Sequence, residues 1–366
     1  MSEGRLATNQ KEKARLDSIE SLRGVAALMI VFYHLVELAQ LPLPPELQII
    51  RTHFGMGVPL FYTLSGFVLA FGYADKLLLG HAEIVSFYVR RFFRIAPLFY
   101  TVLVGWRVIG WLLWSWPISS QSLFLNLTFL FGLVPGEHES LVMAGWSIGL
   151  EMLFYLLFPV LLIFLRGVRS TIVGFVFSIV LSAAASNAYT AAGLGSYAYM
   201  NLITQMPFFI AGMVCFRILR ARGFSDDRYA WPVLATAILL IVLMVKDYSL
   251  YRILQDLHFG ALQHNIWTLI FGLLIYAACT LNPLWLSRGA LRWFGRMSFS
   301  AYLLHPIVMV VLIKAGAIVW LSHFNVWLAF LLGSTITLTL VCAVSYTSYR
   351  WIELPGIVFG KSRLSS

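Results

Sequence analysis

Charged side chains are scarce in this sequence. They account for 11% of its 366 residues, less than half of the roughly 25% typical of soluble domains, whereas 60% of the residues are hydrophobic. A chain with so few charges cannot cover a water-exposed surface, and this composition excludes a soluble globular protein. Most side chains must instead face lipid or one another, as in a protein that crosses a membrane several times.

Cysteine is also rare, with three residues that all lie in apolar segments: Cys215, Cys279 and Cys342. This supply argues against a disulfide framework and against a Cys/His metal site, so we expect neither a metal nor a permanently bound cofactor. Acidic residues are outnumbered by basic ones, 16 to 26, an excess that would suit nucleic acid. The basic residues gather at alternate ends of the apolar runs instead, so we expect contact with membrane lipid and no nucleic acid.

Apolar runs of about 20 residues follow one another along the chain. This length crosses a bilayer as a helix, whereas barrel strands would give alternating segments of about 10 residues. The sequence therefore predicts an all-α polytopic membrane protein with about ten transmembrane helices. The expected spans are 19–40, 54–73, 95–116, 141–165, 170–187, 200–219, 230–246, 263–281, 299–321 and 325–349. A further run, 121–134, is too short to span, and we expect it to be re-entrant or interfacial.

The distribution of Lys and Arg between these spans predicts the orientation. The segments on one side hold most of the basic residues, and those on the other side hold only Arg51, Lys246 and Arg252. The excess of positive charge marks the cytoplasmic side, so we expect both termini in the cytoplasm and a multi-pass protein of the cell inner membrane. We expect a flexible cytoplasmic tail over 1–18, a single transmembrane domain over 19–358 and a second cytoplasmic tail over 359–366.

Few ionisable residues are expected at membrane depth, where a charge costs roughly 2.5 to 3.5 kcal/mol and therefore suggests a function. They are His34, Glu37, Arg107, Glu151, His305 and Lys314. Arg23 stands at the inner mouth of the first span, eleven residues before His34. This spacing places the two side chains on one helix face, about 16 Å apart along the axis.

Glu151 is expected within several ångströms of the depth of His34. A carboxylate beside a histidine raises its basicity, so the pair could act as a general base on a hydroxyl. Two alternatives remain open: a polar pair that only holds two helices together, and a Glu151 that Arg107 neutralises. Ser147, Glu151 and Tyr155 recur every four residues and share one helix face.

Two further pairs of residues can be interpreted either as structural or as functional. Tyr302 and His305 are three residues apart and face together, and we expect His305 near the cytoplasmic end, where a structural role is as well supported as a catalytic one. Arg91 and Arg94 could anchor a helix to lipid phosphates, or they could clamp a phosphate of a cytoplasmic donor.

Six sequence blocks occur in an order that matches one known family. They are SIESLRGVAALMIVFYHL with Arg23 and His34, FYTLSGFVLAFGY with Ser65, RRFFRIAPLFY with Arg91 and Arg94, GWSIGLEMLFYLLFP with Trp146 to Tyr155, GRMSFSAYLLHPI with Tyr302 and His305, and YRWIELP with Glu353. Together they cover essentially the whole chain. In these blocks the sequence resembles the membrane-bound acyltransferase 3 family, and six blocks in order are far more specific than one.

The resemblance implies a ten-helix acyltransferase. Such an enzyme takes an acyl group, usually acetyl, from acyl-coenzyme A in the cytoplasm and delivers it to a hydroxyl, commonly on a surface or exported glycan. In the family, the histidine corresponding to His34 is considered catalytic, and the arginines corresponding to Arg23, Arg91 and Arg94 are associated with donor handling or essential structure. Some members carry an extracellular esterase-like domain, and we expect this chain to be the form without it.

The residues and the resemblance together predict a site. His34, oriented or charge-balanced by Glu151 and accompanied by Arg23, would deprotonate the acceptor hydroxyl, with acetyl-CoA as the co-substrate. The predicted donor-binding residues are Arg91, Arg94, Tyr302 and His305. The predicted channel-lining residues are Ser65, Trp146, Ser147, Tyr155 and Glu353. An acyl-enzyme on a histidine or on Ser65 or Ser147 is the alternative mechanism, and a proton-coupled transporter is the alternative function.

Two outer loops, 117–140 and 247–262, are suited to contact with a sugar acceptor. Aromatic and polar residues gather in or beside them: Trp116, Glu137, His138, Glu139, Tyr248, Tyr251 and Trp267. Aromatic residues at a membrane surface more often serve as interfacial anchors, so these loops give only a weak indication of the acceptor.

Overall fold

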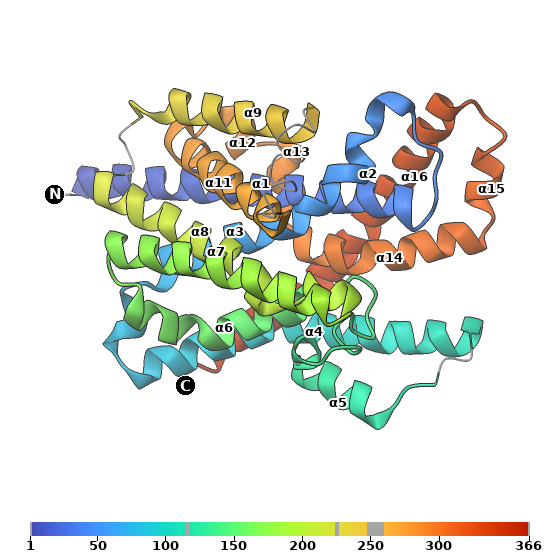
Figure 1. Ribbon diagram of the computed structural model, residues 1–366, viewed down its shortest axis with the longest axis horizontal. Helices are drawn as coiled ribbons and strands as arrows, with labels where there is room; N and C mark the ends of the chain where they lie inside the picture. Colours follow the sequence, from blue (N-terminus) through green and yellow to red (C-terminus); the bar gives the residue numbers. More distant parts are fainter. Residues whose placement is uncertain (1, 115–116, 224–226, 247–259, 365–366) are drawn as a thin grey trace.

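The computed structural model describes residues 2–114, 117–223, 227–246 and 260–364, and these residues form helices and connecting loops without a strand. The helices are α1 (Ser2–Glu37), α2 (Ile49–His53), α3 (Gly57–Tyr73), α4 (His81–Trp114), α5 (Ser120–Thr128), α6 (Trp146–Phe164), α7 (Val168–Ala191), α8 (Leu202–Arg222), α9 (Ala230–Lys246), α11 (Gly260–Leu281), α12 (Leu284–Ser287), α13 (Ala290–Arg296), α14 (Ser298–Lys314), α15 (Ala317–Leu321), α16 (Val326–Ser348) and α17 (Leu354–Ser362). In Figure 1, α9 lies along one long edge of the bundle and α5 along the opposite edge, with α1, α3, α7 and α8 between them.

The long helices confirm the all-α polytopic fold. Among the described residues, eight helices are long and apolar enough to cross a membrane, and α13 with α14 makes a ninth span if the pair, bent by 81°, is counted as one. The shorter apolar helix α9 lies where the seventh span is predicted, so each of the predicted spans coincides with a helix. The run expected to be re-entrant contains α5, whose 9 residues are too few to cross a bilayer.

Helices extend into both segments that are predicted to be tails. Helix α1 begins at Ser2, so the described part of the segment expected to be a flexible tail is helical, and α17 continues to Ser362. The inner end of α1 is held in place by polar contacts that the hydropathy pattern does not reveal. Asp17 forms an ion pair of 2.5 Å with Arg292, and the Ser18 hydroxyl donates a 2.7 Å hydrogen bond to Asn282.

Glycines allow two pairs of helices to approach closely. At the crossing of α3 and α8, a Cβ on Gly66 would lie 1.9 Å from the Phe209 carbonyl oxygen. At the crossing of α1 and α13, a Cβ on Gly24 would lie 2.5 Å from the Leu291 carbonyl oxygen. Small residues are the usual way to pack membrane helices, because lipid supplies little drive for burying larger apolar side chains between them. The second crossing brings Arg23 to the beginning of α14, where its Nε lies 3.5 Å from the Ser298 hydroxyl.

Candidate active site

His34 on α1 and His305 on α14 meet inside the bundle and are called the histidine pair below. The His34 Nδ1 and His305 Nε2 atoms are 2.9 Å apart, and the ring centroids are 4.9 Å apart. His305 is fully buried, whereas His34 is partly accessible. The expectation that His305 lies near the cytoplasmic end is wrong, because α14 begins at Ser298 beside Arg23 and carries His305 two turns deeper into the bundle.

The hydrogen bonds define which nitrogen of each ring carries a proton. His305 Nδ1 lies 3.1 Å from the Ala301 carbonyl oxygen, which can only accept, so Nδ1 of His305 is the donor. In the neutral ring, Nε2 of His305 is then an acceptor, and the proton in the 2.9 Å bond belongs to Nδ1 of His34. His34 is therefore left with an unprotonated Nε2, the form that a general base requires.

Glu151 does not form its hydrogen bonds with His34, which corrects the predicted pair. Its Oε1 accepts a 2.9 Å hydrogen bond from the Ser65 hydroxyl and another from the Tyr155 hydroxyl. The reason is the depth at which Glu151 lies in the bundle. Helix α6 begins only at Trp146 and runs inward, so Glu151 lies more than one turn beyond the first residue of the helix. Arg107, the other predicted partner, is exposed on α4 and lines a separate cavity with Trp106 and Ser140.

Ser147 and Tyr302 lie between the histidine pair and Glu151. The Ser147 hydroxyl donates a 2.7 Å hydrogen bond to the Tyr302 oxygen, whose own proton goes to the Ala144 carbonyl at 2.8 Å. The Tyr302 ring is 5.8 Å from the ring of His305. A cavity of about 30 Å³ touches Arg23, Glu151, Ser147 and Tyr302 and has room for a water-sized group. Neither histidine lines this cavity, and Tyr302 is the lining residue that contacts the histidine pair.

The three arginines have different environments. Arg23 faces Ser298 and lies over the ring of Phe61, with 5.8 Å from its guanidinium carbon to the ring centroid. Arg91 is enclosed by aromatic rings, and its Nε is buried without a hydrogen-bond partner in the part of the chain that the structure describes. The corresponding centroid distances are 5.1 Å for Tyr73, 5.7 Å for Tyr155 and 6.0 Å for Phe87. Arg94 forms no ion pair within 4.0 Å with another described residue, and its charge interacts with the buried carboxylate of Glu353.

Glu353 completes a group of charges on the inner side of the histidine pair. It is 1% exposed and accepts a 2.8 Å hydrogen bond from the Ser300 hydroxyl on α14. It ends a π-helical turn, η6 (Tyr349–Glu353), and such turns often redirect side chains at functional sites. We call Arg23, Arg91, Arg94, Glu151 and Glu353 the charged cluster. All of these residues can be identified from the sequence, and Ser298 lies in one of the family blocks, whereas Ser300 is revealed only by its hydrogen bond to Glu353.

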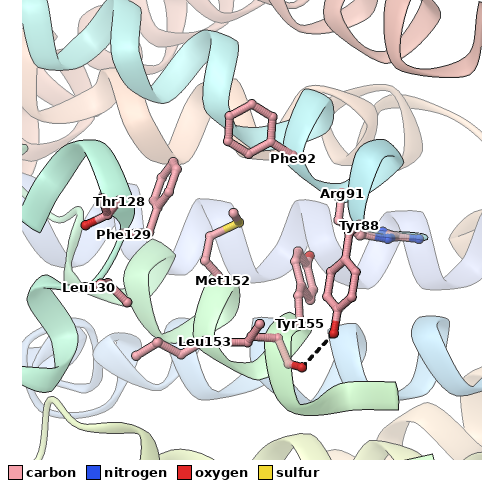
Figure 2. A pocket seen from close by; sticks show the side chains of 10 residues that line it. Tyr88, Arg91, Phe92, Thr128, Phe129, Leu130, Met152, Leu153 and Tyr155 are labelled. Atoms are coloured by element: carbon pink, nitrogen blue, oxygen red, sulfur yellow. Dashed lines mark hydrogen bonds between the residues drawn. The ribbon is translucent and has the colours of Figure 1, made fainter. Parts of the chain in front are cut away.

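A cavity of about 200 Å³ lies beside the charged cluster, between α4, α6 and the end of α5. Figure 2 shows Arg91 and Tyr155 at one end of it and the apolar side chains of Phe92, Phe129 and Met152 around the remainder. Most of its lining is apolar, so it does not suit the phosphates of a nucleotide. The Tyr155 side chain separates this cavity from Glu151, to which its hydroxyl is bonded.

The loops predicted to contact an acceptor are only partly described. Trp116, Tyr248 and Tyr251 lie outside the described residues. In the first loop, His138 Nδ1 accepts a 3.1 Å hydrogen bond from the Gly136 amide, and its Nε2 lies 3.0 Å from the Ser196 hydroxyl. Burial lowers the pKa of His138. These contacts tie the loop before α6 to the turn that precedes α8.

The fold and this geometry define a multi-pass membrane protein with a polar interior that contains a histidine pair and a charged cluster. The chain belongs to the membrane acyltransferase family that its sequence blocks resemble: the family model described as an acyltransferase domain matches residues 16–346. The matched range contains every residue of the histidine pair and of the charged cluster except Glu353. No solved structure matches the chain at a significant level.

Individual relatives have names of the same kind. The exopolysaccharide production protein ExoZ of Rhizobium meliloti is 25% identical over 84% of this chain and 90% of its own length. The peptidoglycan O-acetyltransferase OatA of Listeria monocytogenes is 24% identical over 95% of this chain and 57% of its own. A putative acetyltransferase of Acidianus two-tailed virus is 32% identical over 39% of this chain. The chain spans about two fifths of the length of the relatives with the higher identities.

Proposed function

We propose that this protein is an O-acyltransferase of the cytoplasmic membrane that transfers an acyl group, above all acetyl, from cytoplasmic acyl-CoA to a hydroxyl of a surface or exported glycan. The observation that carries the proposal is the 2.9 Å hydrogen bond between His34 and His305, from which we infer that Nε2 of His34 is unprotonated and can act as a base. The names of OatA and ExoZ support an acyl transfer and a polysaccharide acceptor.

His34 acts as the general base in the proposed reaction. Its Nε2 takes the proton of the acceptor hydroxyl while the hydroxyl oxygen forms a bond to the thioester carbonyl carbon. The carbon–sulfur bond then breaks, and the thiolate of CoA leaves with the proton that His34 returns. The products are an ester and free CoA. His305 keeps its bond to Nδ1 of His34 throughout, so the base needs no rearrangement between the two proton transfers.

The charged cluster handles the donor in this proposal. Coenzyme A is polyanionic, so its phosphates must stay on the inner side, where Arg94 and Arg23 supply positive charge. Arg91 is packed between aromatic rings and acts by positioning Tyr155, which in turn is bonded to Glu151. Because the cavity beside Arg23 has a volume of about 30 Å³, it must widen before a pantetheine arm can reach the histidine pair.

Tyr302 and His305 change their predicted roles. Both were expected to bind the donor, but both lie against the reacting histidine or its partner. In the proposal His305 orients His34. Tyr302 and Ser147 form the polar wall between His34 and the charged cluster, where the thioester carbonyl would be held.

Thioester cleavage by the purified protein tests the proposal. The full chain is reconstituted in lipid nanodiscs with acetyl-CoA, and release of free thiol is followed with and without a glycan preparation. We expect turnover by the wild type and a loss of about 10²- to 10⁴-fold in His34→Ala, the range for removal of a general base. His323→Ala, at an exposed histidine, is the matched control. A wild type without turnover would contradict an acyltransferase and favour the transporter alternative, and an active His34→Ala would exclude His34 as the base.

A further inference from the structure

A second polar cavity lies away from the charged cluster, at the ends of α7, α8 and α11 that the Lys and Arg distribution places outside. These helices pack against one another (Figure 1). The cavity has a volume of about 360 Å³, and we call it the outer groove. Most of the residues that line it carry a hydroxyl, amide or imidazole group, among them Ser182, Ser186, Asn187, Thr190, Tyr199 and His264.

The α7 side of the outer groove is a polar face on an apolar helix. Ser182, Ser186 and Thr190 are spaced by four residues and lie on one face, whereas Val176, Phe177 and Val180 of the same helix are exposed as lipid-facing residues are. Ser182 donates a 2.9 Å hydrogen bond to the Thr204 carbonyl and so joins α7 to α8. Ser186, Asn187 and Thr190 form no side-chain hydrogen bond with another described residue, so helix packing does not account for them.

His264 supplies an independent indication of a ligand. It lines the outer groove, and its Nε2 is buried without a hydrogen-bond partner among the described residues. The ring is held between Tyr199 and Phe208, with centroid distances of 5.0 and 4.8 Å. A buried polar atom without a partner destabilises a fold, and such atoms are retained where water or another bound group completes the hydrogen bond.

Side-chain contacts link the outer groove to the histidine pair. The ring of Tyr199, in the groove wall, is 5.6 Å from the ring of Trp146. Trp146 precedes Ser147, which is bonded to Tyr302, and Tyr302 contacts His305. The Tyr199 carbonyl accepts hydrogen bonds of 2.9 Å from the side chains of Thr204 and Gln205, which hold this part of the wall in place. A series of side-chain contacts through Trp146, Ser147 and Tyr302 therefore joins the wall of the groove to the histidine pair.

We propose that the outer groove binds a saccharide unit of the acceptor and presents it to His34. A sugar ring offers several hydroxyls, each a donor and an acceptor, which match the amide of Asn187, the hydroxyls of Ser186 and Thr190 and the free nitrogen of His264. The ring of Tyr199 offers an apolar face of the kind that packs against sugar C–H groups. Since the groove lies at the outer end of the lipid-facing helix α7, the unit can belong to a soluble glycan or to a lipid-linked one. This inference rests on the proposed function.

The test compares acceptor acylation in cells with thioester cleavage in vitro. A strain that lacks the gene is complemented with the wild type, with Asn187→Leu/Thr190→Val, or with His264→Phe, which keeps an aromatic ring and removes the nitrogens. Base-labile acyl groups are measured in the polymeric glycan and in the lipid extract, and each purified protein is assayed with acetyl-CoA. Thr335→Val on α16, an exposed threonine bonded to its own helix, is the matched control.

We expect both groove variants to lower acceptor acylation at least tenfold more than they lower thioester cleavage, with the control close to the wild type. The fraction that loses its acyl groups identifies a soluble or a lipid-linked acceptor. Equal falls in both assays, or acylation that persists in both variants, would overturn the groove proposal and leave the proposed function standing. No difference in acyl groups between the wild-type and the gene-deleted strain would overturn the proposed function itself.

Discussion

His34 and His305 are joined by one hydrogen bond of 2.9 Å between imidazole rings, whereas the arginines of the charged cluster have aromatic or hydroxyl neighbours. The Ala301 carbonyl fixes the proton of His305 on Nδ1, and His305 in turn fixes the proton of His34 on Nδ1, so that Nε2 of His34 is free to react. Both rings can be neutral in this arrangement. The charged cluster carries fixed positive charge towards the inner side. The comparison shows how one bundle can separate the two requirements of the proposed reaction, which are proton transfer and retention of a polyanionic donor.

Apart from the loss of the base His34 itself, removing the hydrogen-bond acceptor of the histidine pair is expected to have the largest effect on kcat. In His305→Ala, Nδ1 of His34 loses its partner and the ring can adopt the other tautomer, so we expect kcat for thioester cleavage to fall by about 10- to 100-fold. His305→Gln offers an amide oxygen that can accept the same proton and should recover most of the rate. The pH dependence of kcat should change in His305→Ala and not in His305→Gln. Equal losses in the two variants would mean that His305 only fills space.

A smaller effect, on KM and not on kcat, is expected from a change at Arg94 in the charged cluster. Arg94→Ala should raise KM for acetyl-CoA about tenfold or more, because a charge-assisted hydrogen bond to phosphate contributes about 1.5–3 kcal/mol. Its kcat should stay within a fewfold range, since the guanidinium does not touch the reacting atoms. Arg90→Ala, at an exposed arginine of the same helix, is the control. If Arg94→Ala lowers kcat and leaves KM unchanged, the proposed division between the two regions is wrong.

Arg91 should affect stability more than donor affinity. Arg91→Lys keeps the positive charge but loses the flat guanidinium that lies against Tyr73 and Tyr155. We expect a loss of about 1–2 kcal/mol, visible as a thermal midpoint lower by a few degrees, with a KM for acetyl-CoA close to that of the wild type. A large rise in KM with an unchanged midpoint would instead place Arg91 in direct contact with the donor.

The smallest effect is expected outside both regions, at His138. Because burial lowers the pKa of His138 in the folded protein, its neutral form is favoured there, and its Nδ1 must be unprotonated to accept the Gly136 amide. Its contribution to stability is complete above the unfolded pKa of about 6.5 and is lost as the pH falls from that value through the lower pKa of the folded protein. The thermal midpoint of the wild type should therefore fall by more degrees between about pH 7.5 and about pH 5.5 than the thermal midpoint of His138→Gln does. Identical pH dependence in the two proteins, with His323→Gln as the exposed control, would contradict this role.

The positions of the helices could be predicted from the sequence because apolar runs of bilayer length have only one common solution. Each predicted span coincides with a helix, and α5 is too short to span, as expected. The residues of the site could also be identified, since polar side chains in apolar helices are few. These inferences need only the order of residues along one helix.

The partners within the site could not be predicted, because they depend on the depth at which each helix begins. Helix α6 begins at Trp146, several residues later than the hydropathy indicates, and this places Glu151 beside Ser65 and Tyr155. Helix α14 begins at Ser298 after an 81° bend, and this brings His305 to His34. The first residues of α6 and α14 depend on contacts with other helices, and the hydropathy pattern of a single helix does not reveal such contacts.

The protonation state of His34 tests the central claim most directly. Nitrogen NMR of the full chain in nanodiscs, with ¹⁵N-labelled histidine, distinguishes a protonated from an unprotonated ring nitrogen, and the spectrum of His34→Gln assigns the signals. The account predicts that His34 carries its proton on Nδ1 and that Nε2 is unprotonated at neutral pH, with a change of tautomer in His305→Ala. A proton on Nε2 of His34 in the wild type would contradict it.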